Sequence, residues 1–254
     1  MHRFAISTWS VDGLLRSGLP LEELPAQMAA HDISLLELCH FHLASCEPAY
    51  LQRIRRALDA AGVELFTLLI DTGDIAAPDA HLRAAEVATI SGWIAVAAAL
   101  GARRVRISAG RQPPSPQVIE RSASQLAAFS AQAAELGLVT VTENWQATAE
   151  QPEALLAILD LCAGRVGLCA DTGNADATAD KAATLEQLLP RASSVHFKAR
   201  YTPQGEIDRA DLEQCARLMH QSGFDGVITL IYDRKVAEWA GVEQLRHALQ
   251  PLLN

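Results

Sequence analysis

Short apolar runs recur along the chain, and each is followed by a longer segment with helical periodicity. The runs are rich in Val, Ile, Leu and small residues, which is typical of buried strands. The predicted strands are residues 3–8, 33–42, 63–71, 104–108, 138–144, 166–174, 194–198 and 226–232. The predicted helices are residues 21–30, 48–61, 78–100, 115–136, 152–163, 181–190, 208–222 and 236–253. The chain therefore predicts eight strand–helix units.

Strict alternation of strand and helix indicates a parallel sheet that is covered by helices. Eight such units most simply close into a barrel, and 254 residues suit a (β/α)8 TIM barrel. An open, doubly wound sheet is the alternative. That fold would be expected to carry a GxGxxG loop after the first strand, whereas residues 7–13 read Ser-Thr-Trp-Ser-Val-Asp-Gly. We therefore predict an α/β protein with a single TIM-barrel domain over residues 1–254.

Polar side chains with metal-binding capacity follow three successive strands. Glu143, Asp171 and His196 each stand at the end of an apolar run. Since the carboxyl ends of barrel strands meet at one rim, these side chains are expected to converge there. Two carboxylates and an imidazole suit Mn²⁺, Mg²⁺, Co²⁺ or Zn²⁺. Such a metal polarises a carbonyl group and lowers the cost of removing a neighbouring proton. The alternative is a metal-free rim in which the carboxylates pair with Lys198 and Arg106.

Other residues at the same predicted rim are candidates for substrate binding. They are Trp9, Glu37, His40, Arg106, Trp145 and Asn174, and Lys198 is a candidate catalytic cation. The tryptophans are expected to form apolar walls. A buried strand arginine is costly unless it is paired, so Arg106 is expected to contact Glu37, Asp71 or an anionic substrate. Lys198 either contacts the substrate or forms an ion pair with a rim carboxylate. Asp71 and Asp74 are expected to cap their loop.

Composition limits which binding partners and which cellular compartment we expect for this protein. The formal net charge is −9, which argues against nucleic acid as a partner. The five cysteines are scattered and form no CxxC pair, so neither a disulfide framework nor a zinc ribbon is indicated. The N-terminus carries no signal-peptide pattern, and no apolar run is expected to reach the length of a membrane span. We therefore expect a cytoplasmic protein, and the sequence leaves homo-oligomerisation open.

The strand ends resemble those of the xylose isomerase-like TIM-barrel superfamily, which includes sugar isomerases, ketose 3-epimerases and related dehydratases. The resemblance rests on the Glu143-Asn, Asp171-Thr-Gly-Asn and Val-His196-Phe-Lys exits in this order, together with Leu-Glu37-Leu and Gly-Phe-Asp-Gly226. It implies a divalent metal with four ligands from strand ends. Three of the four match, but the glutamate that the family carries on strand eight is Ile231 here. Asp233 lies two residues further on, is expected to share the face of Ile231, and is a candidate substitute that would act through a water molecule.

Because the family's second glutamate also serves as an acid/base group, its replacement affects the chemistry that the resemblance implies. The leading hypothesis is an enzyme that isomerises or epimerises a small polyhydroxy carbonyl compound through an enediolate. Glu143 would be base and ligand, Asp171 and His196 ligands, and Lys198 the partner of a substrate oxyanion. The first alternative is a related lyase that dehydrates a keto-inositol or a shikimate-like acid, for which one base suffices. The second is a metal-free barrel that has lost catalysis.

Overall fold

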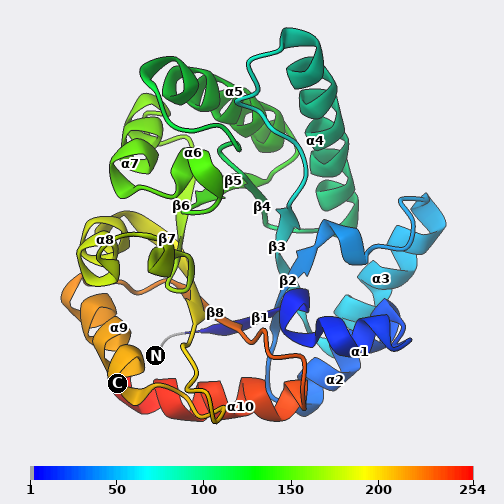
Figure 1. Ribbon diagram of the computed structural model, residues 1–254. Coiled ribbons are helices and arrows are strands. Elements are labelled where there is room, and N and C mark those ends of the chain that lie inside the picture. Colours follow the sequence, from blue (N-terminus) through cyan, green and yellow to red (C-terminus); the bar gives the residue numbers. More distant parts are fainter. Residues whose placement is uncertain (1–2, 254) are drawn as a thin grey trace.

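The computed structural model describes residues 3–253 and shows a closed barrel of eight parallel strands with helices outside it (Figure 1). The strands are β1 (Phe4–Ser7), β2 (Leu35–Cys39), β3 (Glu64–Ile70), β4 (Arg104–Ile107), β5 (Val139–Glu143), β6 (Gly167–Asp171), β7 (Ala192–Lys198) and β8 (Val227–Ile231). Each strand pairs with its neighbour in sequence, and β8 pairs with β1. The predicted TIM barrel is therefore confirmed.

The described helices follow the strands in chain order. They are α1 (Asp12–Arg16), α2 (Leu24–Ala30), α3 (Pro48–Ala61), α4 (Ala80–Leu100), α5 (Pro116–Glu135), α6 (Gln146–Ala149), α7 (Pro152–Leu161), α8 (Lys181–Leu188), α9 (Arg209–Gln221) and α10 (Glu238–Leu249). Local sequence explains several of their ends. Ser115 caps α5 by accepting from the Val118 amide, and Gly62 ends α3 in the left-handed conformation.

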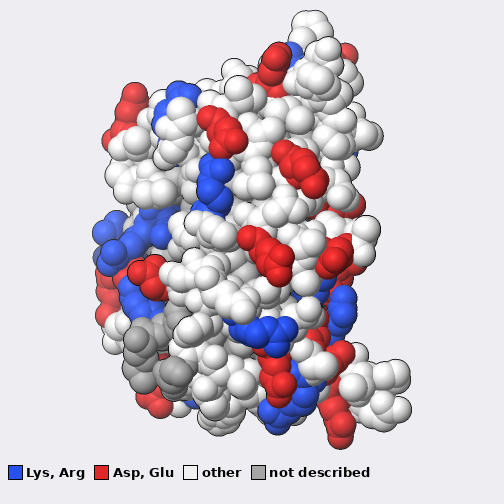
Figure 2. All heavy atoms as spheres, turned by 90° about the vertical axis from the view of Figure 1, so that its left-hand side faces the viewer, with Lys and Arg blue, Asp and Glu red and all other residues white. Residues whose placement is uncertain are grey.

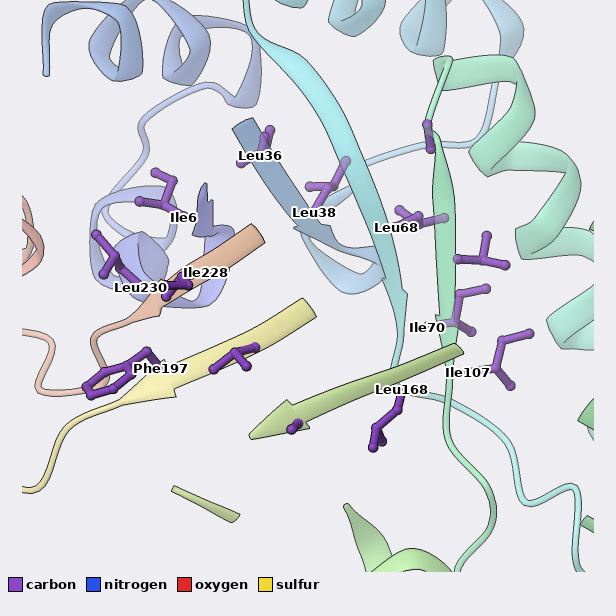
Figure 3. Close-up of a cluster of buried hydrophobic side chains, with 14 of the residues drawn as sticks. Ile6, Leu36, Leu38, Leu68, Ile70, Ile107, Leu168, Phe197, Ile228 and Leu230 are labelled. Atoms are coloured by element: carbon purple, nitrogen blue, oxygen red, sulfur yellow. The ribbon is translucent and has the colours of Figure 1, made fainter. Parts of the chain in front are cut away.

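The hydrophobic core lies between the strands and the surrounding helices. Figure 3 shows strand residues on this helix-facing side: Ile6, Leu36, Leu38, Leu68, Ile70, Ile107, Leu168, Phe197, Ile228 and Leu230. Because strand side chains alternate, the intervening residues point into the barrel. A small separate cluster of Ala5, Leu35, Phe66 and Val227 lies near the beginnings of its strands. Closer to the strand ends many interior residues are polar or charged, and the candidate site lies there.

Two predicted boundaries were wrong near the second and the last strand. The second strand ends at Cys39 rather than at residue 42, because His40–His42 form a turn of 3₁₀ helix. The last helix begins at Glu238 rather than at residue 236, after Lys235 and Ala237 with positive φ angles of 54° and 48°. Both positions adjoin the barrel rim, where loop geometry overrides local periodicity.

The expectation that no segment reaches the length of a membrane span was wrong for α4. This helix has 21 residues and a mean hydropathy of 1.3 over its most apolar window, so it passes a test of length and composition. Only 17% of that window is buried. Its inner face, which includes Ile90, Ile94 and Leu100, packs in the core as a barrel helix should. Length and composition alone are weak grounds for assigning a membrane span.

Charged residues of both signs are interspersed among uncharged ones on the face that carries α7, α8 and α9 (Figure 2). No broad basic surface is visible on this face. A protein that binds nucleic acid without base contacts needs such a surface to neutralise phosphates. The view therefore gives no support for a nucleic-acid partner on this side of the molecule.

The short helix α1 was not predicted, and it carries a buried charged group. The Asp12 side chain is fully buried and contacts Arg16, His42 and Lys235 at 2.8, 2.9 and 2.9 Å. Burial by itself would raise the pKa of the Asp12 carboxyl, but hydrogen bonds from these three side chains hold it well below its usual range. The Asp12 carboxylate therefore ties α1 to the loops that follow β2 and β8.

Replacing Asp12 by asparagine is expected to lower the free energy of unfolding at pH 7 by about 2–3 kcal/mol, because charge-assisted hydrogen bonds are lost. A depressed carboxyl pKa stabilises the fold above the pKa of the unfolded chain, about 4, and this contribution disappears as pH falls through the folded value. The difference between wild type and Asp12→Asn should therefore shrink below about pH 4. Urea unfolding at several pH values measures this difference in unfolding free energy, and the exposed Asp160→Asn is the control. A difference that does not depend on pH would contradict this assignment.

Candidate functional site

A cavity of about 200 Å³ opens at the carboxyl ends of the strands. It is lined by Ser7, Trp9, Cys39, Leu69, Asp71, Arg106, Glu143, Trp145, Asp171, Asn174, His196, Lys198 and Ile231. Every strand of the barrel thus contributes to the cavity, either directly or through the loop that follows it. Three further cavities lie on the outer helices or at the opposite end of the barrel.

Three buried side chains in this cavity form a cluster with metal-ligand chemistry. One ligand atom from each of Glu143, Asp171 and His196 lies within 4.8 Å of the others. Asp171 and His196 are register partners on β6 and β7, and Glu143 ends the adjoining β5. The His196 Nδ1 atom is 3.6 Å from Glu143 Oε1 and 3.6 Å from Asp171 Oδ2. These distances are too long for hydrogen bonds but suit three atoms that share one cation.

The surrounding polar groups orient both carboxylates. Asn174 donates from its side-chain amide to Glu143 Oε1 at 2.7 Å. The backbone amides of Gly173 and Asn174 donate to Asp171 Oδ1 at 2.7 and 2.8 Å, so Asp171 Oδ2 is the oxygen that faces His196. Within residues 3–253, the buried Glu143 Oε2 atom has no hydrogen-bond partner. This oxygen lies 3.2 Å from Arg106 Nε, so Glu143 Oε1 is the oxygen that faces His196 and a cation between them.

Glu37 holds the imidazole of His196 from the other side. Its Oε2 atom lies 2.6 Å from His196 Nε2, and both side chains are almost fully buried. A carboxylate that accepts from one ring nitrogen leaves the other nitrogen free to bind a metal, which is a common second contact at metal-binding histidines. The residues present therefore fit a divalent cation held by Glu143, Asp171 and His196 Nδ1.

The pKa values of the buried cluster reflect its dense negative charge. Burial alone lowers the pKa of His196, but the nearby Cys169 and Glu37 raise it well above its ordinary value. Burial raises the pKa of Asp171, yet the neighbouring His196 imidazole lowers it by more, so the net shift is below the ordinary value. In the absence of a cation the cluster thus favours a protonated imidazole between carboxylates. A metal and that proton compete for the same nitrogen lone pair, so metal binding should release a proton.

Replacing Glu37 by glutamine is expected to weaken Mn²⁺ binding about 10–100-fold without removing a ligand, because the amide no longer fixes the tautomer and orientation of His196. Isothermal titration of the purified variant measures this effect. The exposed Glu153→Gln is the matched control and should bind Mn²⁺ as the wild type does. If Glu37→Gln also behaved like wild type, the proposed orientation of His196 would be wrong.

Arg106 is buried beneath the same cluster and is paired with two carboxylates. It donates from Nη2 to Asp71 Oδ1, and its Nε atom is 3.2 Å from Glu143 Oε2 without the alignment of a hydrogen bond. Its guanidinium group lies over the Trp145 ring at 5.0 Å. Burial opposes the charge, but Asp71 and Glu143 raise the pKa of Arg106 above its ordinary value. The expected contact with Asp71 is present, and the pair with Glu143 is the contact that the metal-free alternative predicted for Arg106.

Lys198 and Asp233 form an ion pair at the β8 side of the cavity. The Lys198 Nζ atom is 2.6 Å from Asp233 Oδ2, so Lys198 does not pair with Glu143 or Asp171. Ile231 is the register partner of Lys198 and lines the cavity from the end of β8. Asp233 therefore faces Lys198 and is not part of the Glu143–Asp171–His196 cluster. The idea that Asp233 substitutes for the missing glutamate ligand gains no support from this geometry.

The remaining predicted substrate-binding residues divide into two groups. Trp9, Trp145, Arg106 and Asn174 line the cavity as expected. Glu37 and His40 are not among its lining residues. Glu37 lies one pleat deeper, against His196, and His40 is drawn into a turn where its Nδ1 atom accepts from the Asp71 amide. Both residues therefore contact residues that line the cavity, and direct contact of either with a substrate stays a prediction.

Sequence reasoning missed several lining residues. Asp71 was interpreted as a loop cap, and its neighbour Asp74 does fill that role by accepting from the Ala76 and Arg111 amides. Ser7, Cys39 and Leu69 were missed because uncharged side chains at strand ends do not stand out in the sequence as candidates for catalysis or metal binding. The alternation that places Glu143 and Arg106 inward would have found them if it had been applied to every strand.

A closed barrel with an acidic cluster and an imidazole at its carboxyl rim defines a TIM-barrel protein with a candidate metal centre. Sequence comparison names the family: the profile of the xylose isomerase-like TIM barrel matches residues 25–252. The chain belongs to this family, as its strand ends predicted. Comparison with curated proteins by sequence gives no match.

Several solved structures share the fold over nearly the whole chain. A structure of L-ribulose 3-epimerase superposes with a TM-score of 0.77 at 18% identity, covering 100% of this chain and 95% of that one. D-allulose 3-epimerase from Methylomonas sp. in complex with D-allulose gives 0.75 at 15% identity, covering 98% and 96%. A xylose isomerase-like protein from Mycobacterium smegmatis in complex with magnesium gives 0.70 at 15% identity, covering 93% and 90%. Identities this low establish the common fold alone.

Proposed function

We propose that the protein is a metal-dependent enzyme that isomerises or epimerises a small polyhydroxy carbonyl compound. The observation that carries this proposal is the buried cluster of Glu143, Asp171 and His196 at the base of the rim cavity. The sugar epimerases that share the fold, and the relative in complex with magnesium, support the same class of substrate and cofactor. The cavity of about 200 Å³ suits a compound of a few carbon atoms.

A divalent cation held by the cluster would supply a Lewis acid for the substrate carbonyl. Glu143 would remove the proton from the carbon next to that carbonyl, and the C–H electron pair would form the double bond of an enediolate. Return of that proton from Glu143 to the neighbouring carbon would give an isomer. An epimer would require water to deliver a proton to the same carbon from the opposite face, and Glu143 would then lose its proton to solvent. Asn174 would hold the Glu143 carboxylate in position through its 2.7 Å hydrogen bond.

The aromatic walls and the cation at the rim would orient the substrate. Trp9 and Trp145 line the cavity and offer apolar faces to the C–H groups of a sugar-like molecule. Lys198 would contact a substrate oxygen that carries or develops negative charge. Arg106 would hold Glu143 beneath the substrate rather than contact the substrate itself, because its guanidinium already pairs with Asp71 and Glu143.

A lyase is the second candidate, and Ile231 is the observation that favours it. The β8 side of the cavity presents this aliphatic side chain and the Lys198–Asp233 pair. One base suffices for dehydration of a β-hydroxy carbonyl compound. Glu143 would remove the α-proton, the C–H pair would become a C=C bond, and the β C–O bond would break with loss of hydroxide, which leaves as water after taking up a proton.

Incubation in D₂O with Mn²⁺ and a panel of small ketoses and keto acids separates these candidates. Carbon-bound deuterium in an isomer or epimer, detected by NMR, supports the first. Loss of water with a new conjugated absorbance supports the lyase. If no member of the panel exchanged and the protein bound no stoichiometric divalent metal, both proposals would fail and a barrel without catalysis would remain.

A further inference from the structure

The Lys198 side chain crosses the rim over a glycine, and this contact restricts its path. A Cβ atom added to Gly173 would lie 2.5, 2.8 and 2.9 Å from Cδ, Cγ and Cβ of Lys198. Carbon atoms do not approach this closely, so any other residue at position 173 would push the lysine stem aside. Gly173 has φ −79° and ψ −37°, which every L-residue adopts. Glycine at this position thus provides space rather than conformational freedom.

Lys198 is held both at its backbone and at the ammonium tip of its side chain. Thr172 Oγ1 accepts from the Lys198 amide at 2.9 Å and donates to its carbonyl at 3.1 Å. At the tip, Nζ lies 2.6 Å from Asp233 Oδ2 in the loop after β8. Since Ile231 is the register partner of Lys198, the stem and tip together carry the ammonium from the end of β7 across to the β8 side.

We propose that Gly173 and Asp233 are positioning residues that hold the Lys198 ammonium beside Ile231, so that the cavity presents a cation on its β8 side and selects substrates with an anionic oxygen there. The proposal rests on the proposed function for the identity of the cavity as the substrate site. It adds a substrate class, which is the anion of a small hydroxy or keto acid in preference to a neutral sugar of similar size. The Asp233 carboxylate orients the ammonium and remains outside the Glu143–Asp171–His196 cluster.

The proposed position of the Lys198 ammonium beside Asp233 is tested by zero-length carbodiimide cross-linking and peptide mass spectrometry. Wild-type protein should give a Lys198–Asp233 cross-link, because the two groups are in contact. Gly173→Ala should lose most of it, because the stem is displaced. Gly92→Ala is the matched control, since a Cβ at this helical glycine meets no atom within 4 Å, and it should cross-link like wild type. An undiminished cross-link in Gly173→Ala would overturn the assignment of Gly173.

The proposed preference for an anionic over a neutral ligand is tested by calorimetric titration with D-glycerate and with glycerol in the presence of Mn²⁺. Wild type and Gly92→Ala should bind glycerate more tightly, and Lys198→Met should lose roughly tenfold in glycerate affinity with little change for glycerol. Gly173→Ala should fall between them. A glycerate preference that survives in Lys198→Met would overturn the proposal. Because neither assay needs turnover, a protein that cross-links and selects glycerate but exchanges no deuterium would refute the proposed function alone.

Discussion

Replacing Glu143 by glutamine is expected to weaken Mn²⁺ binding by at least about tenfold and to reduce turnover by about 10²–10⁴-fold. The glutamine side chain keeps the size of glutamate and can still accept from Asn174, so the fold should remain intact. What it loses is the negative charge that attracts a cation and the basicity that removes a proton from carbon. Metal titration and deuterium exchange from solvent measure the two losses separately.

Glu153→Gln provides the control for Glu143→Gln, because it makes the same chemical change on an exposed position of α7. It should bind metal and turn over like the wild type. Glu143→Gln with normal metal affinity would remove Glu143 from the ligand set. Normal deuterium exchange in the same variant would show that another group is the base.

Introducing glutamate at position 231 is expected to raise Mn²⁺ affinity about 10–100-fold, because it adds a fourth ligand, the third carboxylate, at the rim. The isoleucine is only 6% exposed. Burying a carboxylate there should lower the free energy of unfolding of the metal-free protein by about 1–3 kcal/mol. Saturating Mn²⁺ should restore much of that stability, because a ligand that binds only the folded state stabilises it. Titration calorimetry and thermal unfolding with and without Mn²⁺ test both expectations.

Ile231→Gln is the control that separates the effect of the added negative charge from the effect of the changed side-chain shape. The amide has nearly the size of the carboxylate but no negative charge, so it should gain little metal affinity. If Ile231→Glu left the affinity unchanged, the end of β8 would not face the cluster closely enough to supply a ligand. The proximity of Lys198 adds a competing ion pair, and for this reason the gain is expected to be smaller in Ile231→Glu than in the double variant Ile231→Glu, Lys198→Met.

Most of the barrel could be predicted from the sequence because hydrophobic periodicity and strand–helix alternation agree along the whole chain. The helix at Pro48–Ala61 was predicted with its bounds, since proline and glycine mark its two ends. The short helix α1 escaped detection because five residues are too few for a periodic signal. The apolar character of α4 was underestimated because it comes largely from alanines, many of which lie at the surface.

The cluster could be predicted because three strands end in residues with metal-ligand chemistry and the barrel brings strand ends together. The pairings within the site could not, since they depend on the distance between side chains that are remote in sequence. The contact between Glu37 and His196 joins residues 159 positions apart. The Lys198–Asp233 pair likewise depends on the space left by Gly173, which only the three-dimensional arrangement reveals.

We infer that this rim binds a divalent cation through Glu143, Asp171 and His196 without a ligand from β8. Anomalous diffraction from a crystal equilibrated with Mn²⁺ tests it most directly. We expect one strong peak bounded by the two carboxylates and His196 Nδ1, with no protein ligand from position 231. A peak held by other residues, or no peak at saturating Mn²⁺, would contradict it.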